Sequence, residues 1–394
     1  MTGPDTFDQL LRLHGAEELG RSYLFVRLAR YSVAGRLDYS EISRILSGIR
    51  RRADWVPKWS DAAARHEAQA SAAARREAAV TAGDAFLRAA LCHHWASMFA
   101  EGTAKSDAHA RSLELYRRGS PYFRPPAQRL EIPFEGDHLP AYLRLPPEVE
   151  RPPVVLMIGG ADTNKEELHH WGTEFTLRGF AVVPFDGPGQ GELAARYGRL
   201  TMRFDTFHGA VSAMIDHVER EHPEVDADRI CVFGNSLGGY LALDAALRDP
   251  RVRVVISNGG FADARGLDRW PAPVLGAFSS CLGIADPREV AKHVRRHLAL
   301  SKTPRRNDPA ALVVHGGLED LSDEAEAAAA AEIAGGSLLV VEDAWHTCTN
   351  RDHFVSAVFG DWMTAVLQDP ERARERRTVR VSDERGYAEL FAQG

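Results

Sequence analysis

The sequence of 394 residues predicts an α/β protein that begins with a helical region. Residues 1–125 place apolar side chains at helical spacing and show none of the alternation that strands have. From residue 128 short apolar runs have the character of strands, and a serine-containing turn joins one of them directly to a helix-like stretch. Because the chain is longer than one usual domain, we expect a helical lid domain over residues 1–125 and a catalytic domain over residues 126–369.

Each expected element follows from a local pattern of side chains. Helices of the first domain are expected at residues 7–13, 39–46 and 68–99. Strands of the second domain are expected at residues 130–134, 141–145, 154–158, 230–233, 254–257, 311–315 and 338–341. The first two strands form a hairpin through Gly136-Asp137. Residues 370–394 are rich in arginine and glutamate, and we expect them to form a peripheral or partly mobile tail.

A serine stands between an expected strand and an expected helix. Ser236 lies in Gly234-Asn235-Ser236-Leu237-Gly238, directly after the apolar residues 230–233 and directly before residues 239–247. A turn this tight requires small residues on both sides of the serine, so that a strained backbone can hold its hydroxyl clear of neighbouring side chains. The pattern is that of a nucleophile elbow, and it predicts Ser236 as the nucleophile of acyl chemistry.

A nucleophilic serine of this kind needs an acid and then a histidine, each at the end of a later strand. The expected strand 311–315 leads to Glu319 and Asp320, and the last expected strand, 338–341, leads to His346. We therefore expect His346 as the base and one of the two carboxylates as the acid. Glu319 is slightly favoured, because it is the fifth residue counted from His315, where such loops carry their acid. Asp320 stays the alternative.

A glycine pair follows the expected strand 154–158. The chain continues as Gly159-Gly160-Ala161-Asp162, where the absence of side chains lets the backbone approach a substrate oxygen closely. We expect an oxyanion hole made by the backbone N–H of Gly160 or Ala161 together with that of Leu237.

Four segments together resemble a known family: residues 159–167, 185–192, 234–239 and 346–350. They are similar to the FrsA-like and 2,6-dihydroxypseudooxynicotine hydrolase-like α/β-hydrolases, and the D-G-P-G-Q-G-E run within residues 185–192 is the most specific. The resemblance implies a serine hydrolase with an α/β-hydrolase core and a helical N-terminal domain. Some members of this group cleave a carbon–carbon bond next to a ketone rather than an ester. Glu319 is a departure, since the group usually has aspartate there.

Two further positions are candidates for substrate binding, His94 and Asp263. His94 lies in Cys92-His93-His94-Trp95, within an expected helix. A metal site is not expected there, because adjacent helical residues point about 100° apart and no carboxylate stands at the i+4 spacing. Packing in the core is the simpler role for His94. Asp263, like Asp268, follows the expected strand 254–257, and a solvated loop charge is its simpler role.

Composition narrows the function further. A formal net charge of −7 gives no electrostatic basis for binding nucleic acid. No apolar run reaches the roughly 18 residues of a membrane-spanning helix, and residues 1–8 lack the features of a secretory signal. The four cysteines have no metal-ligand spacing. We expect a cytoplasmic enzyme with a small-molecule substrate and without cofactor, metal or membrane partner, and we consider a homodimer.

The function expected from these residues is that of a serine hydrolase, with an aromatic or polyketide-like carbonyl compound as substrate. Two rivals remain. The first is carbon–carbon bond hydrolysis, or a lyase or cyclase reaction, on the same scaffold. The second is a protein-binding module without catalysis, against which the complete set of serine, acid and histidine argues.

Overall fold

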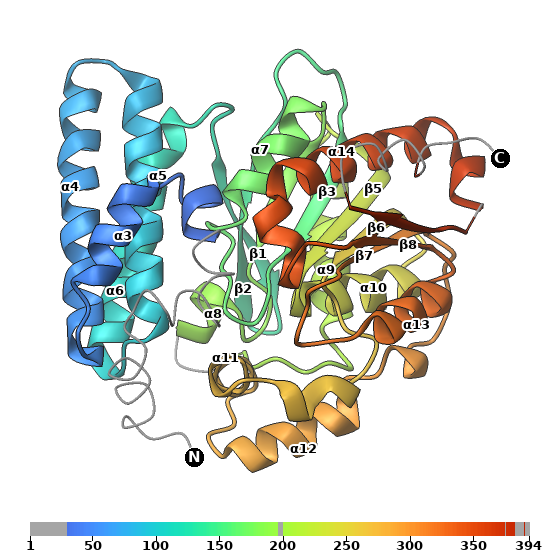
Figure 1. The fold of residues 1–394 in the computed structure, drawn as a ribbon. Coiled ribbons are helices and arrows are strands. Elements are labelled where there is room, and N and C mark those ends of the chain that lie inside the picture. The colour runs from blue at the N-terminus through green and yellow to red at the C-terminus, as the bar shows by residue number, and fades with distance from the viewer. Residues whose placement is uncertain (1–29, 196–199, 375, 383–389, 391–394) are drawn as a thin grey trace. The chain divides into compact units, whose positions relative to one another are not determined.

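The computed structural model describes residues 30–195, 200–374, 376–382 and 390. The chain divides into two compact units, Met1–Arg129 and Leu130–Gly394, which the colours of Figure 1 follow from blue to red. This division falls a few residues after the expected boundary at residues 125–126. The expected helix at residues 7–13 lies outside the described residues.

The first unit is helical. Its long helices are α3 (Tyr39–Ser47), α4 (Trp55–Arg75), α5 (Ala79–Met98) and α6 (Gly102–Gly119). Helix α5 packs against both α4 and α6 (Figure 1). The prediction of helix at residues 39–46 is confirmed, but the single stretch expected at 68–99 is wrong. It belongs to two helices, because the chain turns between them at Glu77, whose φ of 59° is left-handed.

Aromatic side chains form the core of this unit. The rings of Trp59 and Trp95 lie 5.3 Å apart between centroids, and Tyr31 lies 4.6 Å from Trp95. The indole N–H of Trp55 donates to the carbonyl of Trp95 at 2.8 Å, which satisfies a polar atom inside this cluster. The first unit therefore has a hydrophobic centre of its own.

The second unit is built on one sheet of nine strands in the order β1-β2-β4-β3-β5-β6-β7-β8-β9. The strands are β1 (Gln128–Phe134), β2 (Asp137–Leu143), β3 (Pro153–Ile158), β4 (Ala181–Phe185), β5 (Asp226–Asn235), β6 (Val252–Asn258), β7 (Ala310–Gly316), β8 (Ser337–Val341) and β9 (Thr378–Val381). Strand β2 runs antiparallel to β4, and the strands from β4 to β9 pair in parallel.

Helices bury both faces of this sheet (Figure 1). On one face lie side chains of α9 (His208–Glu221), α10 (Leu237–Arg248), α11 (Ala272–Leu282), α12 (Pro287–His297) and α13 (Glu324–Ala334). On the other lie those of α7 (His169–Leu177) and α14 (Asp352–Gln368). Successive residues of β3 alternate between the two cores: Leu156 joins the first and Met157 the second. This double burial explains the continuous apolar runs in the sequence.

The C-terminal segment contains a strand that the sequence does not predict. Within residues 370–394, Thr378–Val381 forms β9, which pairs with β8 at the edge of the sheet. Val379 and Val381 are buried while the residues between and before them are exposed. Only four residues alternate between exposed and buried positions in β9, and arginines surround them. A pattern this short does not identify a strand from the sequence. In the described ranges no helix combines the length and the apolar character needed to cross a membrane.

Candidate active site

Ser236 occupies a strained turn between β5 and α10. Its φ of 58° and ψ of −125° lie in a region that costs a non-glycine residue about 1–3 kcal/mol. Its backbone N–H donates to the carbonyl of Asn258 at 2.8 Å. The flanking glycines are required by space, since a Cβ at Gly238 would lie 2.2 Å from the carbonyl oxygen of Ile158. One at Gly234 would lie 2.0 Å from the carbonyl oxygen of Gly238.

Three side chains from different strand ends form one hydrogen-bonded series. Nε2 of His346 lies 2.8 Å from Oγ of Ser236, and Nδ1 of His346 lies 2.6 Å from Oε1 of Glu319. The Glu319 side chain is fully buried, and Ser322 donates to the same Oε1 at 3.1 Å. Asp320 is exposed and makes no hydrogen bond to His346 within the described residues. Of the two candidate acids, the structure brings Glu319 to the histidine.

The surroundings of His346 favour its charged form. Burial lowers the pKa of His346, but the charge of Glu319 and its hydrogen bond raise it more, and the net pKa lies above the ordinary histidine value. An imidazole held in this way accepts a proton readily and stays oriented while charged. The arrangement can therefore deprotonate a serine hydroxyl.

A buried asparagine connects the nucleophile to the histidine loop. Nδ2 of Asn258, at the end of β6, donates to Oδ1 of Asn235 at 2.9 Å and to the carbonyl of Thr347 at 2.8 Å. Thr347 and Cys348 have φ values of 60° and 53°, so the loop after the histidine is held in a left-handed conformation. Sequence reasoning missed Asn258. Its signal was a polar residue directly after the apolar strand.

The segment Gly159-Gly160-Ala161-Asp162 after β3, here called the glycine loop, lies against Ser236. A Cβ at Gly160 would be 3.1 Å from Cβ of Ser236 and 3.4 Å from its Oγ. Among the hydrogen bonds of the described residues, none is donated by the backbone N–H of Gly160, Ala161 or Leu237. These three groups, which the sequence suggested for an oxyanion hole, are thus not used by the fold itself.

A buried group of charges links this loop to the turn after β4. Nζ of Lys165 lies 2.8 Å from Glu166, 2.8 Å from Asp186 and 2.9 Å from Glu192. Asp186 also accepts the backbone N–H of Lys165 at 2.8 Å and that of Glu192 at 2.9 Å. Burial raises the pKa of Glu166, which is one of three carboxylates around a single ammonium group. The charges of two motifs from the sequence therefore meet in one structural cluster.

Comparison with known proteins agrees with this architecture. A crystal structure of the 2,6-dihydroxy-pseudo-oxynicotine hydrolase superposes with a TM-score of 0.77 at 27% identity, covering 86% of this chain and 95% of that one. The second unit has the α/β-hydrolase fold. A family model described as serine aminopeptidase, S33, matches residues 150–288 of this chain.

Two curated relatives are similar to a little over half of this chain. The chain is 34% identical to the 2,6-dihydropseudooxynicotine hydrolase of Paenarthrobacter nicotinovorans over 55% of its own length and 57% of the relative's. It is 38% identical to the 20-hydroxy-prefusarin hydrolase of Gibberella moniliformis over 56% of its own length and 55% of the relative's. The match thus spans a little over half of these relatives. The resemblance and the fold class expected from the sequence are confirmed.

Of the two candidate substrate-binding residues, Asp263 lies in the same unit as Ser236, but its described hydrogen bonds are to other partners. Asp263 binds Arg265 at 2.8 Å, and the exposed Asp268 pairs with Arg295. His94 is buried in α5 of the helical unit, and burial lowers the pKa of its neighbour His93 to about 4. Within the part of the chain that the structure describes, no group of three or more metal-ligating side chains could hold an ion.

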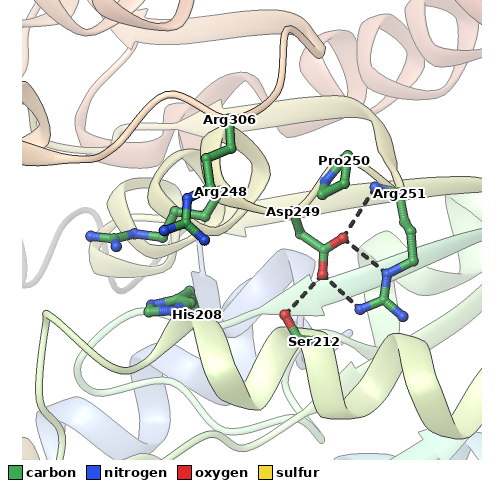
Figure 2. A pocket seen from close by; sticks show the side chains of 7 residues that line it. All are labelled: His208, Ser212, Arg248, Asp249, Pro250, Arg251 and Arg306. Carbon is green, nitrogen blue, oxygen red and sulfur yellow. Dashed lines mark hydrogen bonds and ion pairs between the residues drawn. The ribbon is translucent and has the colours of Figure 1, made fainter.

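A hollow of about 430 Å³ lies elsewhere on the second unit (Figure 2). It is lined by His208, Ser212, Arg248, Asp249, Pro250, Arg251 and Arg306. The Asp249 carboxylate accepts hydrogen bonds from Ser212 and Arg251, each at 2.8 Å. None of the lining residues belongs to the series of serine, histidine and glutamate, so this hollow is separate from the candidate active site.

Proposed function

We propose that this protein is a serine hydrolase that attacks a carbonyl carbon through Ser236. The observation that carries the proposal is the hydrogen-bonded series from Ser236 through His346 to Glu319, with distances of 2.8 and 2.6 Å. Nucleophile, base and orienting acid are each within reach of the next, which is the geometry that activates a serine hydroxyl.

In the proposed reaction His346 takes the Ser236 proton as Oγ attacks the substrate carbonyl. Glu319 stabilises the imidazolium that forms. The backbone N–H groups of Leu237 and of Gly160 or Ala161 stabilise the oxyanion, since no other described group uses them. His346 then returns the proton to the leaving group, and water releases the acyl group by the same steps.

We propose an aromatic or polyketide-like substrate, either an ester or a ketone whose neighbouring carbon–carbon bond is cleaved. Support comes from the family resemblance and from the names of the similar proteins, one a hydrolase of a pseudooxynicotine and one of a prefusarin. The two reactions differ in the atom that receives the proton of His346, an oxygen in the ester and a carbon in the ketone. A cytoplasmic homodimer without nucleic-acid or membrane partners stays a prediction.

Labelling with a fluorophosphonate tests the proposal. The wild type should be labelled at one site and the Ser236→Ala variant should not. A folded wild type that resists labelling would favour a protein-binding role instead. Turnover of a panel of aryl esters and 1,3-diketones then separates ester hydrolysis from carbon–carbon cleavage, and a product of unchanged mass would indicate a cyclase.

A further inference from the structure

Side chains hold three successive carbonyl groups of the glycine loop. Nε2 of Gln190 donates to the carbonyl of Gly159 at 2.6 Å and to that of Gly160 at 3.3 Å. Sγ of Cys281 donates to the carbonyl of Ala161 at 3.1 Å. Gln190 is 1% exposed, and its own Oε1 accepts the backbone N–H of Gly187 at 3.2 Å. This last contact sets which end of the amide faces the loop.

The planarity of the peptide bond transmits these contacts to the other side of the loop. In a trans peptide the carbonyl group and the next residue's N–H point in opposite directions within one plane. The carbonyl of Gly159 therefore sets the direction of the Gly160 N–H, and the carbonyl of Gly160 sets that of the Ala161 N–H. With both carbonyls on Gln190, both N–H groups point away from Gln190.

Glycine makes such a restraint necessary. Gly159 and Gly160 have no Cβ to restrict their backbone, so the peptide planes between them could rotate at little cost. Gly160 must nevertheless stay small, because a Cβ there would lie 3.1 Å from Cβ of Ser236, which is closer than such atoms normally approach. The loop needs glycine for close approach and an external group for rigidity.

The D-G-P-G-Q-G-E run provides that group. A Cβ at Gly189, where φ is 76°, would lie 2.1 Å from the Cys281 carbonyl, and one at Gly191 would lie 2.3 Å from the Asp186 carboxylate. These glycines allow a turn tight enough to place Gln190 beneath the loop, while Asp186 anchors the turn through Lys165.

We propose that Gln190 is a positioning residue that orients the oxyanion-binding N–H groups of Gly160 and Ala161. The inference rests on the proposed serine hydrolase function and assigns a role within that same site. Gln190 acts through the loop, and fixed donors of this kind stabilise developing charge without having to reorganise during the reaction.

The Gln190→Met variant tests this role, since it keeps a similar volume and removes the amide. With p-nitrophenyl butyrate we expect kcat to fall about 10- to 100-fold, somewhat less than for deletion of an oxyanion donor, with KM changed less than about threefold. An aryl trifluoromethyl ketone forms a tetrahedral oxyanion on the serine. Its affinity should fall by about the same factor as kcat/KM, which a merely structural loss would not produce.

Asn307→Leu is the matched control. Nδ2 of Asn307 also holds three backbone carbonyls, those of Ala246, Asp249 and Val252, at 2.9, 2.9 and 2.8 Å. These carbonyls lie where α10 ends and β6 begins, at the end of α10 opposite to Ser236. We expect kinetics within about twofold of the wild type for this variant.

An unchanged kcat in folded Gln190→Met, or a loss confined to KM, would overturn the role of Gln190. If that variant does not fold, Gln190→Asn replaces it, because it keeps the amide but withdraws it by one methylene group. We expect the same loss of kcat for Gln190→Asn, and an unchanged kcat or a loss confined to KM would again overturn the role. Fluorophosphonate labelling separates the two levels. A wild type that is not labelled would overturn the proposed function together with this role, whereas normal wild-type labelling with an equal rate in Gln190→Met would overturn the role alone.

Discussion

At the scale of single residues, Nε2 of His346 lies 2.8 Å from Oγ of Ser236, so in the proposed reaction neither residue can act without the other. We expect Ser236→Ala and His346→Ala each to lower kcat/KM on the order of 10⁴-fold, and the double variant to lower it no further. Steady-state kinetics measure this, and circular dichroism checks the fold. Ser212→Ala, which loses a hydroxyl that donates to Asp249 away from Ser236, should stay near wild-type activity. More than about a tenth of the activity remaining in Ser236→Ala would refute the assignment.

The acid offers a second comparison, because two neighbouring carboxylates differ in their contacts. The Glu319 side chain is buried and contacts His346, whereas Asp320 is exposed to solvent. We expect Glu319→Gln to lose at least about tenfold more activity than Asp320→Asn, since an amide neither stabilises the imidazolium nor holds the correct tautomer. Equal and small losses would place the acid elsewhere on the chain.

The same pair of variants has a pH signature. The pKa of His346 is raised by Glu319, and the base must be neutral to act, so kcat/KM of the wild type should fall as the pH drops through a value above about 6.5. Removing the charge in Glu319→Gln should move this acid limb to lower pH. Asp320→Asn should move it less, because Asp320 contributes less to the shift. A limb that stays in place in Glu319→Gln would contradict the electrostatic role of Glu319.

The sequence revealed these residues unequally. Strand, elbow and chain order were enough to propose Ser236 and His346, which the structure places within hydrogen-bonding distance of each other. They could not separate Glu319 from Asp320, since adjacent loop residues differ only in the direction of their side chains. Asn258 and Gln190 escaped functional prediction because their roles arise from hydrogen bonds to backbone groups far along the chain.

At the scale of elements, the ammonium group of Lys165 connects the segment after β3 to the turn after β4 through its ion pairs with Asp186 and Glu192. Lys165→Met would leave the buried carboxylates of Asp186 and Glu192 without their cation. We expect a loss of about 3–5 kcal/mol in the free energy of unfolding, measured by urea denaturation. Lys292→Met, at an exposed ion pair with Glu289, should change it by less than about 1 kcal/mol. A similar small effect in Lys165→Met would mean that solvent reaches the cluster.

The elements show where periodicity helps and where it fails. Strands buried on both faces appeared as apolar runs, and the run at residues 230–233 matched the core of β5. The segments before and after Glu77 are rich in alanine, and such small side chains do not distinguish a buried helix face from an exposed one. The boundary between α4 and α5 therefore could not be recognised from the sequence. Strand β9 stayed hidden because its pairing with β8 depends on a partner distant in the sequence.

At the scale of the whole second unit, the residues of the candidate active site lie at one edge of the sheet. Ser236 follows β5, Asn258 ends β6, Glu319 follows β7, His346 follows β8 and Gly160 follows β3. These strands are parallel, so their carboxyl ends meet at one edge, which is where α/β sheets place ligands. Topology thereby brings together residues that lie up to 186 positions apart, His346 and Gly160.

The helical unit raises the last question at this scale, because its own core of tryptophan and tyrosine rings shows that it is a folded body. We expect a chain that begins near residue 126 to be poorly soluble, or to hydrolyse small activated esters while losing activity on bulky substrates that the full-length chain accepts. The physical reason is that amphipathic helices need a partner for their apolar faces, and a lid would supply one wall of the substrate site. Kinetics of the full-length and shortened chains on p-nitrophenyl butyrate and on the bulkiest substrate that the full-length enzyme accepts measure the effect. Equal kinetics on the bulky substrate would show that the helical unit is an appendage and that the site is not enclosed by it.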